Sequence, residues 1–107
     1  MGAKEITEAE WDDTVINSAK PVVVDFWAEF CSPCRAMSRV LDEVANEHDE
    51  IAVVKINIED YPEIAARYNV SSIPFFARFD AGKLTRSVVG SMSKPKLVAS
   101  LLDSSVL

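Results

Sequence analysis

Long apolar runs are missing from this 107-residue chain. A transmembrane helix needs about 20 consecutive, mostly apolar residues, and no stretch approaches that length. The residues from Met1 to Ile6 contain no apolar signal core, and Ile6 stands where a myristoylation motif requires Ser or Thr. We therefore expect no membrane association.

An excess of positive charge is missing as well. The chain has 11 Lys and Arg residues against 17 Asp and Glu residues, which gives a net charge of −6. Proteins that bind nucleic acids generally present a basic face to the phosphate backbone. We therefore expect no nucleic-acid partner.

Cysteine and histidine are scarce. Cys31 and Cys34 are the only cysteines, and His48 is the only histidine. Two cysteines at this spacing do not make the disulfide framework of a small secreted domain, so we expect a cytoplasmic location. A structural zinc site needs four ligands, so we expect no self-contained metal site, and a cluster bridging two chains stays an alternative.

What the sequence does contain fits one small folded domain. Apolar residues make up 49% of the chain and charged residues 26%, as in ordinary globular proteins. The length allows a modest core and leaves no room for a second one. We expect a single domain over residues 1–107.

Hydrophobic patterns predict the elements at the N-terminus. Residues 4–7 fit a short strand. Thr7 and Glu10 form a capping-box pattern, which predicts a helix ending near Asn17. The buried residues of this helix would be Trp11, Val15 and Ile16.

Strands and helices then alternate. The β-branched and aromatic run 22–28 predicts a central strand covered on both faces. Residues 35–47 repeat apolar side chains at helical spacing, residues 51–57 fit the next strand, and a short helix ends near Tyr68. Two strand–helix–strand connections of this kind imply a parallel core.

The C-terminal third has a different pattern. Residues 74–79 and 84–89 flank a short turn with a glycine, which predicts an antiparallel hairpin. Ser93 fits the N-cap of a last helix with Pro95 in its first turn. The whole pattern predicts an α/β protein with a mixed sheet and helices on both faces.

Cys31 and Cys34 lie between a predicted strand and a predicted helix. Residues three apart on a helical turn have Cα atoms about 5–6 Å apart, within the span of a disulfide. Unpaired N–H groups in the first turn stabilise a thiolate, and Arg35 adds positive charge. Pro33 fits an early helical position. The arrangement indicates a dithiol–disulfide redox site; buried structural thiols and half of a metal site are the alternatives.

Residues 25–35, DFWAEFCSPCR, resemble the active-site segment of the thioredoxin family, DFWAxWCGPCK. Residues 53–58 and 70–74 agree as well, and Gly82 and Gly90 stand at the expected later places. The resemblance covers essentially the whole chain. It implies the thioredoxin fold, with a central mixed sheet of about five strands flanked by four helices.

The resemblance also implies the chemistry of protein disulfide reduction. Cys31 would be the exposed nucleophile that attacks a substrate disulfide, and Cys34 the more buried thiol that resolves the mixed disulfide. The implied partners are disulfide-containing proteins and a thioredoxin-reductase-like electron donor. We expect a monomer with no bound cofactor.

Asp25 is an acidic residue inside an apolar strand. Alternation places it on the same face as Val23 and Trp27, which favours burial over a surface position. A buried carboxyl group has a raised pKa and could take the proton from Cys34, the role that the resemblance implies. Lys55, on the neighbouring strand, either pairs with Asp25 or is solvated.

The resemblance further implies a substrate groove. Ile73 and Pro74 would form a cis peptide bond opposite the dithiol, and the backbone before it would pair with an extended substrate. Gly90 would line the same groove, with a strand-end turn as its alternative. The candidate substrate-binding set also includes Trp27, Phe30, Ser32 and Pro33; for Trp27, packing beside the site is the alternative.

Four residues depart from the family pattern. Ser32 replaces a glycine, and a hydroxyl donating to Cys31 would stabilise the reduced form. Phe30 replaces a Trp, Arg39 a helix-kinking Pro and Phe75 a small Thr, so we expect a straighter helix and a narrower groove. These departures leave two alternatives: a specialised, more oxidising exchanger with few partners, and a non-catalytic interaction module of the same fold.

Overall fold

The computed structural model describes residues 2–102, so Met1 and residues 103–107 of the expected domain lie outside the described residues. Within residues 2–102, five strands form one mixed sheet in the order β1-β3-β2-β4-β5. The strands are β1 (Lys4–Glu5), β2 (Val22–Trp27), β3 (Ala52–Asn57), β4 (Phe75–Asp80) and β5 (Lys83–Val89). The α-helices of the described chain are α1 (Ser32–Glu47), α2 (Pro62–Arg67) and α3 (Lys94–Leu101).

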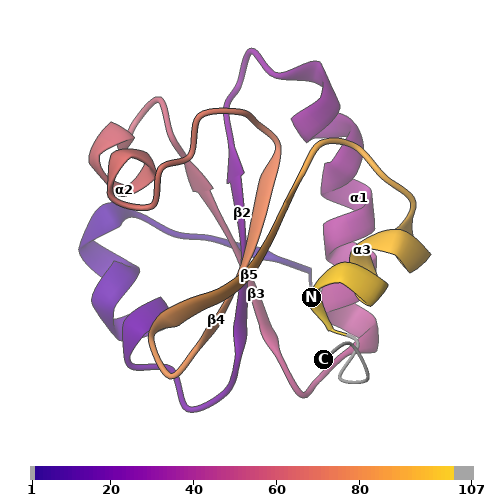
Figure 1. Ribbon diagram of the computed structural model, residues 1–107, viewed down its shortest axis with the longest axis horizontal. Coiled ribbons are helices and arrows are strands. Elements are labelled where there is room, and N and C mark those ends of the chain that lie inside the picture. Colours follow the sequence, from indigo (N-terminus) through magenta and orange to yellow (C-terminus); the bar gives the residue numbers. More distant parts are fainter. Residues whose placement is uncertain (1, 103–107) are drawn as a thin grey trace.

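The sheet is the middle layer of the molecule. Figure 1 shows α1 and α3 on one side of it, with α2 and the N-terminal helical turns on the other. The β1–β3 and β2–β3 pairs are parallel, whereas β4 pairs antiparallel with both β2 and β5. The predicted parallel core and C-terminal hairpin are confirmed.

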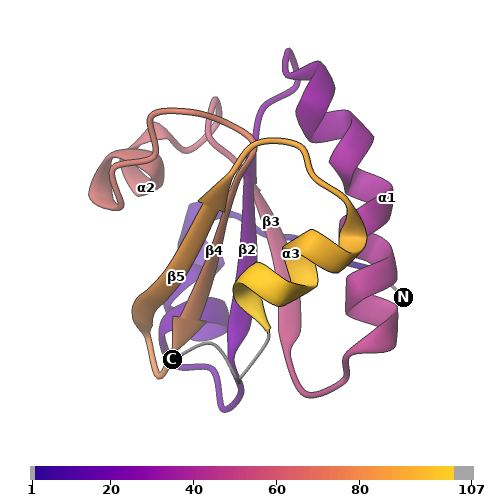
Figure 2. The same ribbon diagram turned by 45° about the vertical axis from the view of Figure 1, so that its right-hand side comes forward.

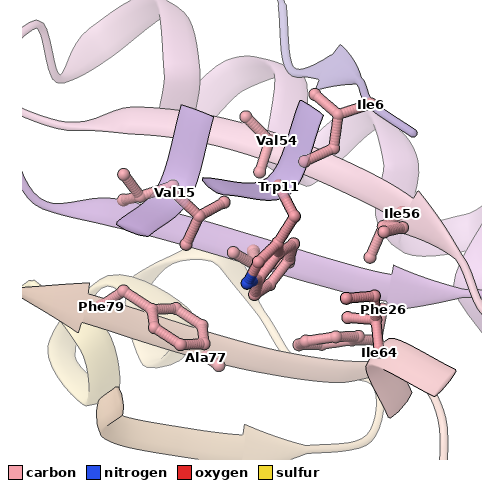
Figure 3. Packing of buried hydrophobic residues seen from close by; sticks show 11 residues of the cluster. Ile6, Trp11, Val15, Phe26, Val54, Ile56, Ile64, Ala77 and Phe79 are labelled. Atoms are coloured by element: carbon pink, nitrogen blue, oxygen red, sulfur yellow. The ribbon is translucent and has the colours of Figure 1, made fainter. Parts of the chain in front are cut away.

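One face of the sheet is covered by α2 and the N-terminal helical turns. Trp11 lies in the middle of this cluster (Figure 3). Its ring meets Phe79 edge-on at 5.5 Å between centroids, and Phe26 and Tyr68 lie 6.1 and 5.6 Å away. The buried members of the cluster are Ile6, Trp11, Val15, Val22, Val24, Phe26, Val54, Ile56, Ile64, Ala77 and Phe79.

The opposite face is covered by α1 and α3, which lie together on that side in Figure 2. Its buried residues are Val23, Met37, Leu41, Val44, Ile51, Val53, Phe76, Leu97 and Leu101. Since successive side chains of a strand point to opposite faces, Asp25 and Trp27 share the α1 face with Val23. Alternation along β2 therefore directs an acidic side chain toward the helix that carries Cys34.

The predicted N-terminal helix is present, but it is not a regular α-helix. It consists of a 3-10 turn (Glu8–Glu10) and a short π-helix (Asp12–Ile16) that ends at Asn17. The capping interaction is present in part, because the Thr7 N–H donates to Glu10 Oε1 at 2.9 Å. The β-branched run Thr14, Val15 and Ile16 is crowded in a regular α-helix, and the irregular turns still bury Trp11 and Val15.

Two departures from the family pattern have clear structural outcomes. Helix α1 is continuous from Ser32 to Glu47, and Arg39 lies on its exposed side. The helix begins three residues before the predicted start at residue 35. Phe75, which the sequence predicts to narrow or grease the substrate groove, is the second departure. Its ring packs edge-on against Phe26, with 5.6 Å between centroids, because β4 alternation turns it into the core on the α2 side.

The β4–β5 hairpin closes through Ala81 and Gly82. Both residues have positive φ, +52° and +81°, the backbone pattern of a two-residue type I′ turn. Such a turn matches the right-handed twist of the two strands. Across residues 2–102, no helix combines the length and apolar character that crossing a membrane requires.

Candidate active site

The dithiol lies where β2 passes into α1. Cys31 and Cys34 form a disulfide with their Cα atoms 5.2 Å apart. Cys31 is the N-cap of α1, and its Sγ accepts a hydrogen bond from the Cys34 N–H at 3.1 Å. A sulfur at this position faces the unpaired N–H groups and the positive end of the helix dipole. The site thus favours a thiolate at Cys31 when the disulfide is reduced.

The expectation that Cys31 is exposed is wrong, although the order of the two cysteines is as expected. Cys31 is 6% exposed and Cys34 2%. The two sulfurs pack with Ala28 against the half-buried Trp27 and Ile73. A substrate disulfide must therefore fit closely against this surface to reach the Cys31 sulfur.

The residues around the dithiol form a polar turn with one large apolar side chain. The Arg35 guanidinium donates to the Glu29 carbonyl oxygen at 2.7 Å and to Ser32 Oγ at 3.4 Å, which fixes its charge over the turn. Ser32 Oγ accepts from Arg35 in this oxidised form, and its hydroxyl hydrogen is still available for the donation to Cys31 expected in the reduced form. Phe30 is 70% exposed at the rim, and Pro33 occupies the first turn of α1.

Asp25 is fully buried, as alternation predicted. Neither carboxyl oxygen accepts a hydrogen bond from the described residues. Burial raises the pKa of the Asp25 carboxyl from 3.8 to about 7, while the Lys55 charge lowers it and the Glu5 charge raises it further. Asp25 can therefore gain and lose a proton near neutral pH.

Lys55 lies directly opposite Asp25 in the β2–β3 register, but its ammonium group is held elsewhere. Lys55 Nζ donates to Ser38 Oγ on α1 at 2.8 Å, and it lies 5.5 Å from the centroid of the Trp27 ring. Trp27 Nε1 donates in turn to Glu5 Oε2 at 3.0 Å. The sequence predicted that Lys55 either pairs with Asp25 or is solvated. The structure shows a hydrogen bond from Lys55 to Ser38 instead.

A second loop lies beside the dithiol turn. The Ile73–Pro74 peptide bond is cis, as the resemblance implied, and Pro74 is buried directly before β4. Gly90 follows β5, and its N–H donates to the Pro74 carbonyl oxygen at 2.9 Å. In Figure 1 the β2–α1, α2–β4 and β5–α3 connections all lie at the same edge of the sheet. The structure thus brings together the loops that carry the candidate substrate-binding residues.

Sequence reasoning missed Glu5 and Ser38. Glu5 lies opposite Lys55 in the β1–β3 register, a relationship that no sequence spacing reveals. Ser38 could have been found, because it follows Cys34 by four residues and so lies on the same side of α1. Ser38 also lines a pocket of about 340 Å³ together with Trp27, Glu29, Cys34, Arg35 and Lys55.

The described residues hold no group of three or more His, Cys, Asp or Glu side chains suited to a metal ion. His48, at the far end of α1 from the dithiol, contacts Glu50 at 3.1 Å.

Comparison with known proteins agrees with this geometry. The sequence profile of the Thioredoxin family matches residues 2–103. A thioredoxin of Pyropia yezoensis is 45% identical over 102 residues, covering 94% of this chain and 95% of that protein. A thioredoxin of Acidithiobacillus ferridurans is 41% identical over 100 residues, covering 92% of each chain. A chloroplastic M-type thioredoxin of Spinacia oleracea is 38% identical over 99 residues, covering 92% of this chain and 55% of that protein.

A dithiol at a helix N-cap, on a mixed α/β sheet and beside a cis-proline loop, defines a thiol–disulfide oxidoreductase. The family profile and the relatives extend over nearly the whole chain, so the match is not confined to the Cys-x-x-Cys turn. The chain belongs to the thioredoxin family and has thioredoxin-type protein-disulfide reductase activity.

Proposed function

We propose that Cys31 is the attacking thiolate and Cys34 the resolving thiol in the reduction of disulfide-containing proteins. The observation that supports this assignment is the position of Cys31 Sγ at the N-cap of α1, where it accepts the Cys34 N–H. The N–H groups and the positive end of the helix dipole at this position stabilise a thiolate, which makes Cys31 the better nucleophile.

The reaction has two exchange steps. The Cys31 thiolate attacks one sulfur of the substrate disulfide, forming a mixed disulfide and releasing the other substrate sulfur as a thiolate. The Cys34 thiolate then attacks Cys31 Sγ, which releases the second substrate sulfur and leaves the Cys31–Cys34 disulfide. The substrate gains two electrons and two protons, and a reductase-type donor then supplies two electrons, with two protons, to the Cys31–Cys34 disulfide and restores the dithiol.

Asp25 is proposed to accept the Cys34 proton in the second step. Its support is a buried carboxyl group without hydrogen-bond partners among the described residues, on the sheet face that α1 covers, with a pKa of about 7. Asp25→Asn should slow resolution by about tenfold or more while leaving the initial attack of Cys31 nearly unchanged. Rapid-mixing kinetics of the two steps test this role, and equal rates in both proteins would contradict it.

The substrate-binding surface is proposed to be the edge where the dithiol and cis-proline loops meet. Ile73 and Pro74 would align an extended substrate segment, and Gly90 would leave room for its backbone, since a Cβ there would meet nothing within 4 Å. The exposed ring of Phe30 offers apolar contact area, and Trp27, Ser32 and Pro33 complete the proposed surface.

The setting of the reaction is proposed from the sequence and the relatives. The chain would act as a single domain and a monomer in the cytoplasm, with no nucleic-acid or membrane partner. Relatives named as chloroplastic make a plastid the alternative compartment. Sedimentation of the full chain and localisation of the tagged protein test these two statements separately.

Trapping of the mixed disulfide tests the assignment of the two cysteines. Reduced Cys34→Ser protein should accumulate a covalent adduct with a protein disulfide through Cys31, visible by mass spectrometry. Matched Cys31→Ser protein should form at least tenfold less adduct in the same time. A faster adduct at Cys34 than at Cys31 would reverse the assignment.

A more oxidising exchanger is the second candidate function, favoured by Ser32 between the cysteines and the fixed Arg35 charge next to it. Equilibration with glutathione or dithiothreitol buffers decides between the two. Thioredoxins have a reduction potential of about −270 mV, and a value at least about 50 mV less negative would support the specialised exchanger.

A further inference from the structure

Three charged side chains form one row across the α1 face of the sheet. Glu5 on β1 lies opposite Lys55 on β3, and Lys55 lies opposite Asp25 on β2. Paired residues in adjacent strands point to the same face, so the lysine stands between two carboxyl groups. On the other side of Asp25, β4 contributes the apolar Phe76.

The Lys55 ammonium group is hydrogen-bonded to Ser38 and not to Asp25. Its hydrogen bond to Ser38 Oγ is 2.8 Å long, and the Trp27 ring lies under it at 5.5 Å. Glu5 fixes that ring, because Glu5 Oε2 accepts the indole N–H at 3.0 Å. Both oxygens of Asp25 lack a hydrogen-bond partner among the described residues.

We propose that Ser38 and Glu5 are positioning residues that hold the Lys55 ammonium group away from Asp25, so that the Asp25 carboxyl group has no direct counter-ion when it exchanges a proton with Cys34. The proposal rests on the role proposed above for Asp25. It assigns a function to two residues that lie outside the dithiol and the substrate groove.

The charges around Asp25 give the expected signs. The charged groups that act on it are Lys55 from β3 and Glu5 from β1. Burial is the largest cause of the raised Asp25 pKa; Lys55 opposes it and Glu5 adds to it. A cation that comes within about 4–6 Å of a carboxylate lowers its pKa by about 1–3 pH units. Release of Lys55 from Ser38 should therefore lower the pKa of Asp25.

Glu5 acts through its negative charge and through Trp27. Partial desolvation raises the pKa of the Glu5 carboxyl, and the Trp27 hydrogen bond and the Lys55 charge oppose this effect. Glu5→Gln keeps an oxygen that can accept the indole N–H but removes the charge that competes for Lys55. Like Ser38→Ala, it should lower the pKa of Asp25.

The experiment is a titration of the Asp25 carboxyl carbon by NMR in the oxidised protein, where neither cysteine titrates. Ser38→Ala and Glu5→Gln should each lower the Asp25 midpoint by about 0.5–1 pH unit, and the double variant should lower it most. Lys55→Met should raise the midpoint. Ser87→Ala, on the far edge strand β5, is the matched control and should leave it in place.

A variant that lacks the lysine separates positioning from a merely structural effect. If Ser38 acts by holding Lys55, then Ser38→Ala should not change the Asp25 midpoint in the Lys55→Met background. An unchanged midpoint in Ser38→Ala alone would overturn the proposal. An equal fall with and without Lys55 would also overturn it. Thermal unfolding of each variant confirms that the folded protein is being titrated.

Kinetics then separate this proposal from the proposed function. The pH midpoint for resolution of the mixed disulfide should fall in Ser38→Ala by the same amount as the Asp25 midpoint. If the Asp25 midpoint falls but the kinetic midpoint stays, Ser38 positions Lys55 as proposed and Asp25 is not the proton acceptor. That outcome overturns the catalytic role of Asp25 alone.

Discussion

The Gly90 N–H donates a hydrogen bond of 2.9 Å to the carbonyl oxygen of Pro74, which joins the loop after β5 to the cis-proline loop before β4. Gly90 has φ +102°, a conformation that side chains with a Cβ rarely adopt. The space beside its Cα is open, so the backbone angle and not a clash is what favours glycine here.

Gly90→Ala should therefore cost about 1–2 kcal/mol of the free energy of unfolding, measured by denaturant titration. The added methyl group points into the proposed groove, so KM for a protein disulfide should rise several-fold. KM for a small-molecule disulfide is the internal control and should change little. Equal changes for both substrates would argue against a substrate backbone at this position.

Asp25 should make the folded protein less stable as the pH rises, the opposite of what most carboxyl groups do. Its pKa is about 7 in the folded protein, whereas the ordinary value is 3.8. This difference corresponds to about 4 kcal/mol in the free energy of unfolding. Because the folded state holds this proton more tightly, the contribution is complete below about pH 4 and is lost as the pH rises through 7.

Asp25→Asn removes this titration while keeping the shape of the side chain. The stability of the variant relative to the unchanged protein should rise by about 4 kcal/mol between pH 4 and pH 8. Denaturant titrations of both proteins over this range measure the difference, and other carboxyl groups cancel in the comparison. A difference that stays constant with pH would show that Asp25 has an ordinary pKa.

The hairpin turn gives a matched pair of substitutions with opposite signs. Ala81→Gly relieves a positive φ of +52° and should stabilise the protein by about 0.5–1 kcal/mol. Gly82→Ala introduces strain at φ +81° and places a Cβ 2.8 Å from the Ile16 carbonyl oxygen, so it should cost about 2 kcal/mol or more. Thermal unfolding of both variants checks the prediction, and changes of the same sign would contradict it.

Trp11 combines extensive packing with a buried N–H that has no acceptor among the described residues. Trp11→Ala should cost about 3–5 kcal/mol, because it leaves a large cavity between Phe26 and Phe79. Trp11→Phe should cost only about 1 kcal/mol, since the lost volume is offset by removal of the unpaired donor. Denaturant titration measures both, and similar losses in the two variants would contradict the prediction.

The strands and the dithiol could be predicted because their signals are local. A continuous β-branched run such as Val22–Trp27 fits a buried strand, and the spacing of Cys31 and Cys34 fits one helical turn. Alternation alone was enough to predict the burial of Asp25.

Features that depend on strand register or on competing local preferences could not be predicted. The partner of Lys55 depends on where α1 crosses the sheet, which brings Ser38 within 2.8 Å of its ammonium group. The N-terminal helix was predicted from a capping pattern that is present, but the β-branched residues after Asp13 disfavour a regular α-helix. The packing of Phe75 against Phe26 likewise follows from the register of β4 on β2.

The disulfide between Cys31 and Cys34 spans a sequence separation of only three residues. In the chain-entropy view, closing so small a ring restrains the unfolded chain by about 2 kcal/mol, compared with nearly 5 kcal/mol for a loop of 100 residues. Opening it therefore removes only a small contribution to the free energy of unfolding, and we expect both core clusters to persist in the reduced form. The Cys31–Cys34 pair can therefore be reduced and oxidised repeatedly while the domain stays folded, as repeated turnover of a disulfide reductase requires.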